Sequence, residues 1–442
     1  MKTKLIIFVA YCLSVINLNA QPEKVLRSGP MLGYAEMLES VIWVQTISEA
    51  KVYATYAPVA KPEMIRHTNT VFTNRQEAFT AHLIADSVEP GQRYTYTIWV
   101  NDQAVRLPYP TEFQTQAIWK WRGNPPAFRM LTGSCAYINQ AEHDRPGNPY
   151  GGDYCIFENM AKHQADLMLW LGDNIYLREP DWNSWTGITK RYTHGRSLPE
   201  LRALLANVHN YAIWDDHDFG PNDSDKGFYN KQQTLDAFKL FWGNPTYGVG
   251  DITGAITSFQ WGDADFFLLD NRWHRDPDNL KKDHKTMLGK EQLEWLFDNL
   301  VYSTNTFKII ALGGQFLNPA SYFETYSNNG FAEERQQIID FICQHNIKNV
   351  IFITGDVHFT EMSVLRQAGK PTIWDLTFST MTAGANRDGG NWPNTLRVEG
   401  TVVTDRNFGE IDFTGPTNNR QLKVRCYDTD NHLRWERTIT PE

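Results

Sequence analysis

The sequence predicts an α/β protein with two structural units, an N-terminal β-sandwich over residues 21–120 and a larger α/β unit over residues 121–442. Three observations support this prediction. The 442 residues are too many for one ordinary hydrophobic core. The first part of the chain is rich in β-branched and aromatic runs, whereas the second alternates short apolar runs with helical stretches. Prolines and glycines near residue 120 separate the two patterns.

Residues 1–20 have the pattern of a secretory signal peptide. Lys2 and Lys4 precede an apolar stretch over residues 5–18, and Ala20 provides the small residue of a cleavage site. About a dozen apolar residues are too few to span a bilayer. We therefore expect an exported protein, periplasmic or secreted, with no membrane span in the mature chain. The alternative is a buried N-terminal strand.

The N-terminal unit is predicted to be a sandwich of the fibronectin or immunoglobulin type. Its strands are expected at Ser40–Thr46, Ala50–Tyr56 and Tyr94–Val100, where apolar and polar residues partly alternate. Turn signals separate these runs, including the Glu-Pro-Gly-Gln sequence that begins at Glu89.

Six short runs in the second unit are almost wholly apolar, which is typical of strands covered by helices on both faces. The runs are Phe128–Thr132, Leu167–Leu171, Tyr211–Trp214, Phe266–Leu269, Phe307–Leu312 and Val350–Thr354. Helices are expected between them, for example at Gly289–Leu300 and Glu333–His345. A late run, Leu422–Tyr427, is expected at the edge of a second sheet. The pattern predicts a layered α/β architecture.

Composition excludes several classes of protein. A hydrophobic fraction of 41% and a charged fraction of 21% exclude a disordered chain. With a formal net charge of −9, no stable binding of nucleic acid is expected. Five irregularly spaced cysteines form no disulfide framework. Pairing among the four cysteines after the signal segment, and the oligomeric state, stay open.

Polar residues follow five of the apolar runs. They are Gly133-Ser-Cys135, Gly172-Asp173-Asn-Ile-Tyr176, Asp215-Asp216-His217-Asp218, Asp270-Asn-Arg272 and Gly355-Asp356-Val-His358. Ligands of open α/β sheets bind beyond the carboxyl ends of the strands. A single aspartate there is often only a helix cap, and a single cysteine is often a buried apolar residue. Several carboxylates crowded together repel one another, however, unless cations offset them.

The donor types in these motifs indicate two kinds of metal ion. Asp173 can bridge two metals, and Tyr176, one turn later, can reach one of them. Phenolate and thiolate ligands favour Fe(III) over Mg²⁺. Oxygen donors around Asp216 and Asn222 suit Ca²⁺ or Mg²⁺. Two metals about 3.5–4 Å apart are the usual clamp for in-line attack on phosphorus.

At these motifs the chain resembles the alkaline phosphatase D family, within the calcineurin-like and purple-acid metallophosphatases. The five motifs occur in the family's order, and the resemblance covers nearly the whole mature chain. It implies an α/β/β/α metallophosphatase domain after the β-sandwich. It also implies a ferric ion and one or two calcium ions. The ferric ligands would be Cys135, Asp173, Tyr176 and Asp356.

In the same resemblance, Asp173 would bridge the metals, and Asp216 and Asn222 would serve the calcium side. One departure concerns that side: family members often carry Glu where this chain has Asp218, followed by a Phe-Gly-Pro turn that leads to Asn222. The departure leaves the calcium ligand set open.

These expectations combine into one hypothesis, an exported phosphoesterase that hydrolyses phosphate mono- or diesters by attack of a metal-bound hydroxide. His217 and His358 are expected to stabilise phosphoryl oxygens or protonate the leaving group. Alternatively, each histidine only orients a metal ligand. Arg272 can pair with a phosphate, whereas Arg275 can be a structural ion pair.

Two further points stay open in the sequence. Trp182, Trp185 and the segment Met381–Val398 are expected either to cover the site or to serve as packing. The function could be specialised for nucleic-acid or phospholipid diesters. A protein of another class, a calcium-binding surface protein, is the non-enzymatic alternative, but calcium alone does not call for Cys135 and Tyr176.

Overall fold

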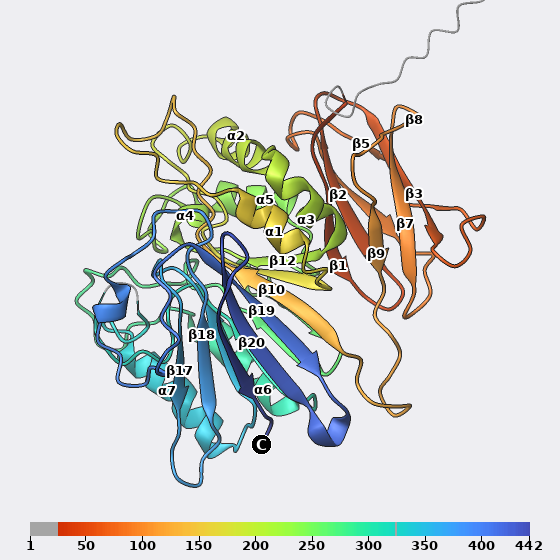
Figure 1. Ribbon diagram of the computed structural model, residues 1–442. Helices are drawn as coiled ribbons and strands as arrows, with labels where there is room; N and C mark the ends of the chain where they lie inside the picture. The colour runs from red at the N-terminus through yellow and green to blue at the C-terminus, as the bar shows by residue number, and fades with distance from the viewer. Residues whose placement is uncertain (1–24, 323–324) are drawn as a thin grey trace, which may run out of the picture.

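The computed structural model describes residues 25–322 and 325–442, so the predicted signal peptide lies outside the described residues. The predicted mixed α/β fold is confirmed. Two large sheets and one smaller sheet form the described chain, with helices on the outer faces of the large sheets (Figure 1). No helix in these two ranges has the length and apolar character needed to cross a membrane.

The first large sheet has nine strands. They are β1 (Leu26–Ala35), β2 (Ser40–Thr46), β6 (Thr80–Ala85), β10 (Phe128–Gly133), β11 (Leu167–Leu171), β12 (His209–Ile213), β19 (Asn407–Thr414), β20 (Gln421–Asp428) and β21 (Leu433–Ile439). Their order is β21-β20-β19-β10-β11-β12-β1-β2-β6. Strands β10, β11 and β12 run parallel, which brings their carboxyl ends to one edge.

The second large sheet has six strands. They are β13 (Thr257–Trp261), β14 (Ala264–Leu268), β15 (Phe307–Ala311), β16 (Val350–Thr354), β17 (Glu361–Leu365) and β18 (Ile373–Thr377). Their order is β13-β14-β15-β16-β18-β17, and β14, β15, β16 and β18 run parallel. All six apolar runs predicted to be strands are therefore strands.

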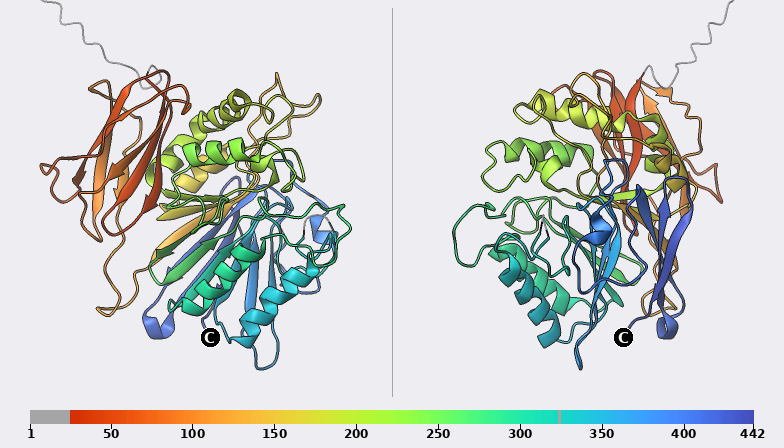
Figure 2. Two further views of the ribbon diagram at one scale, coloured as in Figure 1. Left: turned by 180° about the vertical axis from the view of Figure 1, so that it is seen from behind. Right: turned by 60° about the vertical axis from the view of Figure 1, so that its left-hand side comes forward.

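The two large sheets pack face to face between two layers of helices (Figure 2). Within β11, Leu167 and Leu169 belong to the core between the sheets, while Met168 and Trp170 belong to the core under the helices. Both faces of the strand are thus buried by apolar neighbours. This is why the run carries no alternation of polar residues.

Helices α1 (Cys155–Ala161), α2 (Trp185–Arg196), α3 (Arg202–Asn207) and α5 (Lys231–Phe241) cover the nine-stranded sheet. Helices α6 (Lys290–Tyr302) and α7 (Ala332–Gln344) cover the six-stranded sheet and agree with the two expected helices. A single turn, α4 (Asp216–Phe219), directly follows β12. Three short 3₁₀ turns complete the helical content of the described chain: Pro199–Leu201, Gly389–Asn391 and Thr417–Asn419.

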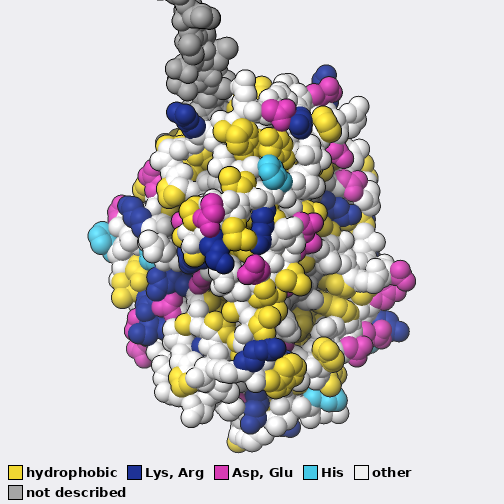
Figure 3. Space-filling model, turned by 90° about the vertical axis from the view of Figure 1, so that its right-hand side faces the viewer, with side chains coloured by type: hydrophobic (Ala, Val, Ile, Leu, Met, Phe, Trp, Pro, Cys, Tyr) yellow, Lys and Arg dark blue, Asp and Glu magenta, His cyan; other side chains and the backbone are white. Residues whose placement is uncertain are grey.

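The N-terminal part contains a third sheet. Its strands are β3 (Lys51–Pro58), β4 (Arg66–His67), β5 (Val71–Phe72), β7 (Arg93–Val100), β8 (Gln103–Ala104) and β9 (Glu112–Gln114). This sheet shares a buried core with β1, β2 and β6, so two sheets lie face to face. Its outward side carries charges of both signs between groups of hydrophobic side chains (Figure 3). The fibronectin or immunoglobulin type stays a prediction.

One sheet runs across the boundary expected near residue 120. Strand β1 pairs in parallel with β12, with Leu32 opposite His209. Side chains strengthen the junction: the amide of Asn210 donates to the carbonyl of Leu32, and the hydroxyl of Tyr96 donates to the carbonyl of Ala206. The pairing covers the edge that β12 would otherwise expose. The N-terminal strands are therefore part of the framework that carries the strand ends.

The prediction for the C-terminal run is wrong in one respect. Residues 422–427 lie in β20, which pairs with β19 and β21. Because β19 pairs antiparallel with β10, these strands extend the same sheet that carries β10, β11 and β12. The antiparallel return of β19 along β10 decides this placement, and a pattern of local residues does not reveal it.

Candidate metal centre

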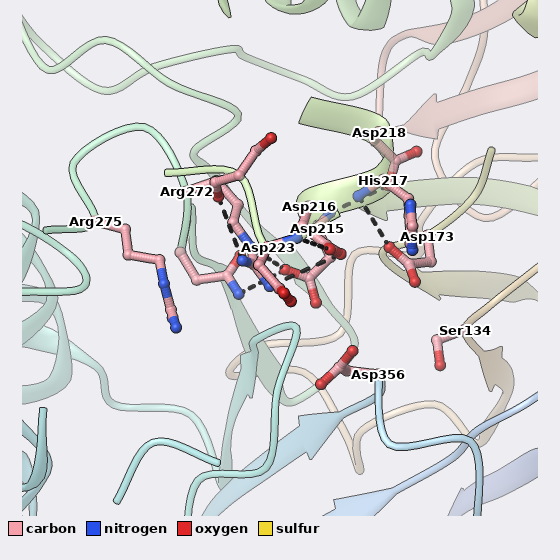
Figure 4. A network of polar contacts seen from close by, with 12 residues as sticks. Ser134, Asp173, Asp215, Asp216, His217, Asp218, Asp223, Arg272, Arg275 and Asp356 are labelled. Atoms are coloured by element: carbon pink, nitrogen blue, oxygen red, sulfur yellow. Dashed lines mark hydrogen bonds and ion pairs between the residues drawn. The ribbon is translucent and has the colours of Figure 1, made fainter. Parts of the chain in front are cut away.

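The carboxyl ends of strands from both large sheets meet at one edge of the core between them. Cys135 follows β10, Asp173 follows β11, Asp216 follows β12, Arg272 follows β14 and Asp356 follows β16. Figure 4 shows the carboxylates of the site converging, with Arg272 approaching from the side opposite Asp173. The structure thus brings together residues that are far apart in the sequence.

Three groups of possible metal ligands form this cluster. The donor atoms within each group lie within 4.8 Å of one another: Cys135, Asp173 and His358; Asp173, Asp216 and His217; and Asp215, Asp216 and Asp356. Asp173 belongs to the first two groups and Asp216 to the last two. The three groups therefore form one continuous row of thiol, imidazole and carboxylate donors.

Four residues of the row have left-handed backbone conformations. The angle φ is +61° at Cys135, +51° at Asp173, +68° at Asp356 and +60° at His358. Such angles are uncommon for residues with a side chain and cost about 1–3 kcal/mol each. The first three residues occupy the same position, two residues past the end of their strand. Repeated strain at equivalent positions is typical of a functional site.

His358 is held in one orientation. Its Nδ1 forms a hydrogen bond with the carbonyl oxygen of Gly384, and its backbone NH donates to the hydroxyl of Ser379 at 3.0 Å. A carbonyl can only accept, so Nδ1 carries the proton and Nε2 presents its lone pair. Nε2 lies 3.3 Å from the hydroxyl of Tyr176. Metal-binding histidines are commonly oriented through the other ring nitrogen in this way.

Cys135 and Tyr176 need a strongly Lewis-acidic partner to act as anions. The thiol lies 3.3 Å from the hydroxyls of Ser134 and Ser379 and 3.7 Å from a carboxylate oxygen of Asp173. Burial raises the pKa of the Cys135 thiol to about 11. Burial and the charge of Asp173 raise the pKa of Tyr176 well above its ordinary value. These donors fit a ferric ion better than Mg²⁺.

The opposite end of the row is built from carboxylates. Asp215 accepts from the Nε of Arg272 and from the amide of Asn271 at 2.9 Å. One oxygen of Asp216 accepts from the backbone NH of Asp223 at 2.7 Å. Its other oxygen is buried, makes no hydrogen bond to a described residue, and lies 3.9 Å from Arg272. A buried carboxylate oxygen that accepts no hydrogen bond is suited to coordinate a hard cation such as Ca²⁺.

The two shared carboxylates carry opposite pKa shifts. Burial, followed by the charges of Asp216 and Cys135, raises the pKa of Asp173 well above its ordinary value. Burial alone would also raise the pKa of Asp216, but His217 and Arg272 hold it below the ordinary value. Asp173 is therefore the position where a cation would relieve the most repulsion.

The predicted catalytic residues lie at different depths. His217 is half-buried, and the centre of its ring lies 4.1 Å from the centre of the Tyr176 ring. The backbone NH of His217 donates to the carboxylate of Asp173 at 3.4 Å. Arg272 has a side-chain exposure of 0% and lies behind the carboxylate of Asp215. Its guanidinium therefore contacts carboxylates of the cluster. The phosphate contact predicted from its charge stays a prediction.

Arg275 points away from the cluster (Figure 4). Its guanidinium pairs with Asp278 at 3.0 Å and lies 4.6 Å from the centre of the Phe331 ring. These contacts agree with the alternative that Arg275 is a structural ion pair.

Asp218, where the chain departs from the family pattern, joins two loops of the site. Its carboxylate accepts from the backbone NH groups of Asp215, Asn174 and Ile175 at 3.1–3.3 Å. Burial raises its pKa to about 7. Asn222 is exposed in the turn beyond α4, and its role as a ligand stays a prediction.

The segment Met381–Val398 contacts the site directly. Beside the carbonyl of Gly384 that holds His358, the backbone NH of Asn386 donates to the carbonyl of His358 at 2.8 Å. The backbone NH of Ala383 donates to the carbonyl of Cys135 at 3.0 Å. By contrast, two aromatic residues of the other expected loop, Trp182 and Trp185, pack against the core under the helices. They agree with the packing alternative.

Sequence reasoning misses three residues of the site. Asp215 stands in its motif without an assigned role, although two adjacent acids after a buried strand are a usable signal. Ser379 follows β18 and touches both Cys135 and His358, but no motif marks it. Tyr150 lies in a loop before α1, and nothing in the pattern places it near His358.

Comparisons with known proteins agree with this geometry. A family model described as PhoD-like phosphatase matches residues 130–411, and a model described as a domain of unknown function (DUF7800) matches residues 23–118. The chain is 26% identical over 433 residues to alkaline phosphatase D of Bacillus subtilis (strain 168), with 87% of this chain and 70% of that protein covered.

Two solved structures share the fold. A structure of PhoD superposes with a TM-score of 0.77 at 21% identity, covering 94% of this chain and 89% of that one. The purple acid phosphatase PPD1 from yellow lupin (Lupinus luteus) seeds superposes with a TM-score of 0.65 at 12% identity, covering 93% and 74%. Because the first family model matches more than half of the chain, the protein belongs to the PhoD-like phosphatase family and is a phosphoric ester hydrolase.

Proposed function

We propose that the protein is an exported, metal-dependent hydrolase of phosphate mono- or diesters. The row of three linked donor groups is the observation that carries the metal dependence. A cluster that combines a thiol, imidazoles and four buried carboxylates at strained strand ends has no evident structural purpose. The family membership indicates the reaction class, phosphoric ester hydrolysis, and the donor groups could bind the metal ions that the reaction needs.

We assign Fe(III) to the end of the row formed by Cys135, Asp173 and Tyr176. The orientation of His358 supports it as a fourth donor at this end. The family resemblance implies Asp356 as a ferric ligand, but its carboxylate groups with Asp215 and Asp216. This grouping supports a role for Asp356 toward the second cation, for which Ca(II) is the proposed ion.

Metal ions at such a site lower the pKa of water and offset negative charge on phosphoryl oxygens. The chain's own residues prepare the site for this chemistry. Asp173 supplies a carboxylate to both ends of the row. Arg272 and Asn271 hold Asp215 in position. His217 is the proposed donor of a proton to the leaving group, because its ring is half-buried beside Tyr176.

The assignment of the metals is tested by elemental analysis and a visible spectrum of the purified protein. We expect iron and calcium, with a tyrosinate-to-iron charge-transfer band that is absent in Tyr176→Phe while the iron content is retained. Tyr302→Phe is the matched control and should keep the band, because it alters an exposed tyrosine at the end of α6. A colourless wild-type protein without iron would contradict the ferric assignment.

The preference between monoesters and diesters is tested by two chromogenic substrates. Turnover of 4-nitrophenyl phosphate is compared with turnover of bis(4-nitrophenyl) phosphate. The second candidate function, a phosphodiesterase for nucleic-acid or phospholipid diesters, predicts that the diester is strongly preferred. Family membership as a phosphoric ester hydrolase sets aside the non-enzymatic alternative of a calcium-binding surface protein.

Export and domain division complete the proposal. We propose that residues 1–20 are removed, which mass spectrometry of the mature N-terminus would test. We also propose a division into residues 21–120 and 121–442. The pairing of β1 with β12 implies that residues 121–442 produced alone would expose the edge of β12 and be less soluble than the full chain.

A further inference from the structure

Tyr150 stands at the outer side of the metal centre. It belongs to the loop between β10 and α1, and its side chain is 44% exposed. The centre of its ring lies 5.0 Å from the centre of the Tyr137 ring and 6.1 Å from the centre of the Tyr176 ring, in both cases edge to face. Its hydroxyl lies 3.4 Å from Nδ1 of His358. One side of the ring therefore touches residues of the site, while the rest faces solvent.

The backbone around Tyr150 is held on both sides. The guanidinium of Arg406 donates to the carbonyl of Tyr150 at 3.1 Å, to the carboxylate of Asp153 at 2.8 Å and to the carbonyl of Ala383 at 3.0 Å. The next residue, Gly151, exchanges two hydrogen bonds of 2.7 and 2.8 Å with the side chain of Asn139. The backbone that carries the exposed ring is thus held in place before any ligand arrives.

The ring also rests on the segment that orients His358. A methyl group on Gly384 would come within 2.8 Å of the Tyr150 ring, so only a glycine allows this approach without movement. In the free enzyme, an aromatic face that is half-exposed beside a catalytic centre leaves apolar surface in contact with water, which is unfavourable. Such a face is useful when a ligand covers it.

We propose that Tyr150 determines specificity in the proposed phosphoesterase. Its ring packs against the organic group of the ester, so that esters with a flat aromatic group bind more tightly than esters of small alkyl groups. The proposal rests on the proposed function, because the phosphoryl group must lie at the donor row for its organic group to reach Tyr150. An aromatic contact of this kind changes affinity by about twofold to tenfold.

The test uses two non-hydrolysable probes that differ only in the organic group, phenylphosphonate and methylphosphonate. Their dissociation constants are measured by calorimetry on the metal-loaded full chain, for wild type, Tyr150→Ala and Tyr150→Phe. We expect wild type to prefer the phenyl compound by about twofold to tenfold. Tyr150→Ala should lose this preference, and Tyr150→Phe should keep it. Methylphosphonate should bind all three proteins with similar affinity.

Tyr302→Ala is the matched control. Tyr302 is 83% exposed at the end of α6, just before β15 begins, and so lies at the sheet end opposite the donor row. It should leave both constants unchanged. If Tyr150→Ala does not fold, Tyr150→Leu replaces it, because leucine fills the space without a planar face. An unchanged preference in a folded Tyr150 variant overturns the proposal.

Steady-state kinetics separate this role from a structural one. With an aryl ester, Tyr150→Ala should raise KM while kcat stays within about threefold. A fall in kcat with equal losses for both probes would instead show that Tyr150 only positions His358, and would overturn the proposal. If wild type hydrolyses no phosphate ester and binds neither probe, the proposed function itself fails. Turnover with an unchanged preference contradicts only the role of Tyr150.

Discussion

Two clusters of carboxylates, one across the nine-stranded sheet and one where the ends of the two large sheets meet, show how charge balance separates a structural site from a functional one. In the first, Glu410 and Asp412 of β19 lie between Arg129 of β10 and Arg425 of β20. Asp412 is 2.7 Å from Arg129 and 2.8 Å from Arg425, and Glu410 also pairs with Arg425 and with His163. Every acid there has a basic partner across the strands.

The second cluster is the metal centre, where four buried carboxylates gather and Arg272 contacts two of them, Asp215 and Asp216. The chemical consequence is visible in the pKa values. Burial alone would raise the pKa of Asp412, but its two arginines hold it below the ordinary value. The pKa of Asp173 is raised by burial and by its acidic neighbours. A balanced cluster stabilises the sheet by itself, whereas an unbalanced one requires cations from outside the chain.

The largest effect of a substitution is expected at Asp173, which belongs to the metal centre. Asp173→Asn keeps the shape of the side chain but removes the charge shared by two donor groups. We expect loss of bound metal and a fall in kcat of at least about a thousandfold. Elemental analysis and turnover of a nitrophenyl ester measure both. Asp412→Asn is the matched control and should keep metal content and kcat per folded molecule. Full metal retention in Asp173→Asn would refute its bridging role.

A buried histidine that hydrogen-bonds to backbone groups extends the comparison to pH. His209, at the junction of β1 and β12, contacts the carbonyl of Gly33 through Nδ1 and the backbone NH of Gln114 through Nε2. Burial lowers its pKa from the ordinary 6.5 to about 4. Because the folded state resists protonation, the free energy of unfolding should fall as the pH drops from 6.5 to 4, by about 3 kcal/mol.

Urea unfolding at several pH values, on wild type and His209→Gln, isolates this contribution. Glutamine can keep both hydrogen bonds but does not titrate. The free energy of unfolding of His209→Gln should therefore change less with pH over this range than that of wild type. Parallel curves for the two proteins would show that His209 is not responsible.

The structural cluster should respond in stability alone. Asp412→Asn leaves two arginines partly uncompensated, and we expect a loss of about 2 kcal/mol in the free energy of unfolding, since Arg129 is partly exposed. Metal-free Asp173→Asn should be no less stable than metal-free wild type, because it relieves repulsion. Urea unfolding of both variants in the presence of a chelator measures this contrast. Equal losses would remove the distinction between the clusters.

A weaker effect is expected at Arg272, the arginine that contacts the carboxylates of the metal centre. Lysine cannot reproduce the fork of donors with which Arg272 meets Asp215 and Asp216. We expect Arg272→Lys to weaken calcium binding by about tenfold, measured by calorimetry. Unchanged calcium affinity with weaker inhibition by inorganic phosphate would instead favour the direct phosphate contact predicted from the sequence.

Much of the site could be predicted because its chemistry is local. Cys135, Asp173 and Asp356 each follow an apolar run closely, and a buried strand of a parallel sheet implies where its next residues lie. Other features depend on contacts between distant segments. The orientation of His358 comes from Gly384, and the placement of Tyr150 comes from Arg406. Sequence spacing carries no information about such partners.

The identity of the six apolar strands of the second unit, and of the chemical groups that follow five of them, follows from the amino-acid sequence alone, because burial on both faces leaves a continuous apolar run. The choice of neighbouring strands follows only from the three-dimensional fold. It joins β1 to β12 across the expected boundary and returns β19 along β10. Strand pairing depends on backbone hydrogen bonds between segments far apart in the chain, and those bonds are nearly independent of side-chain identity.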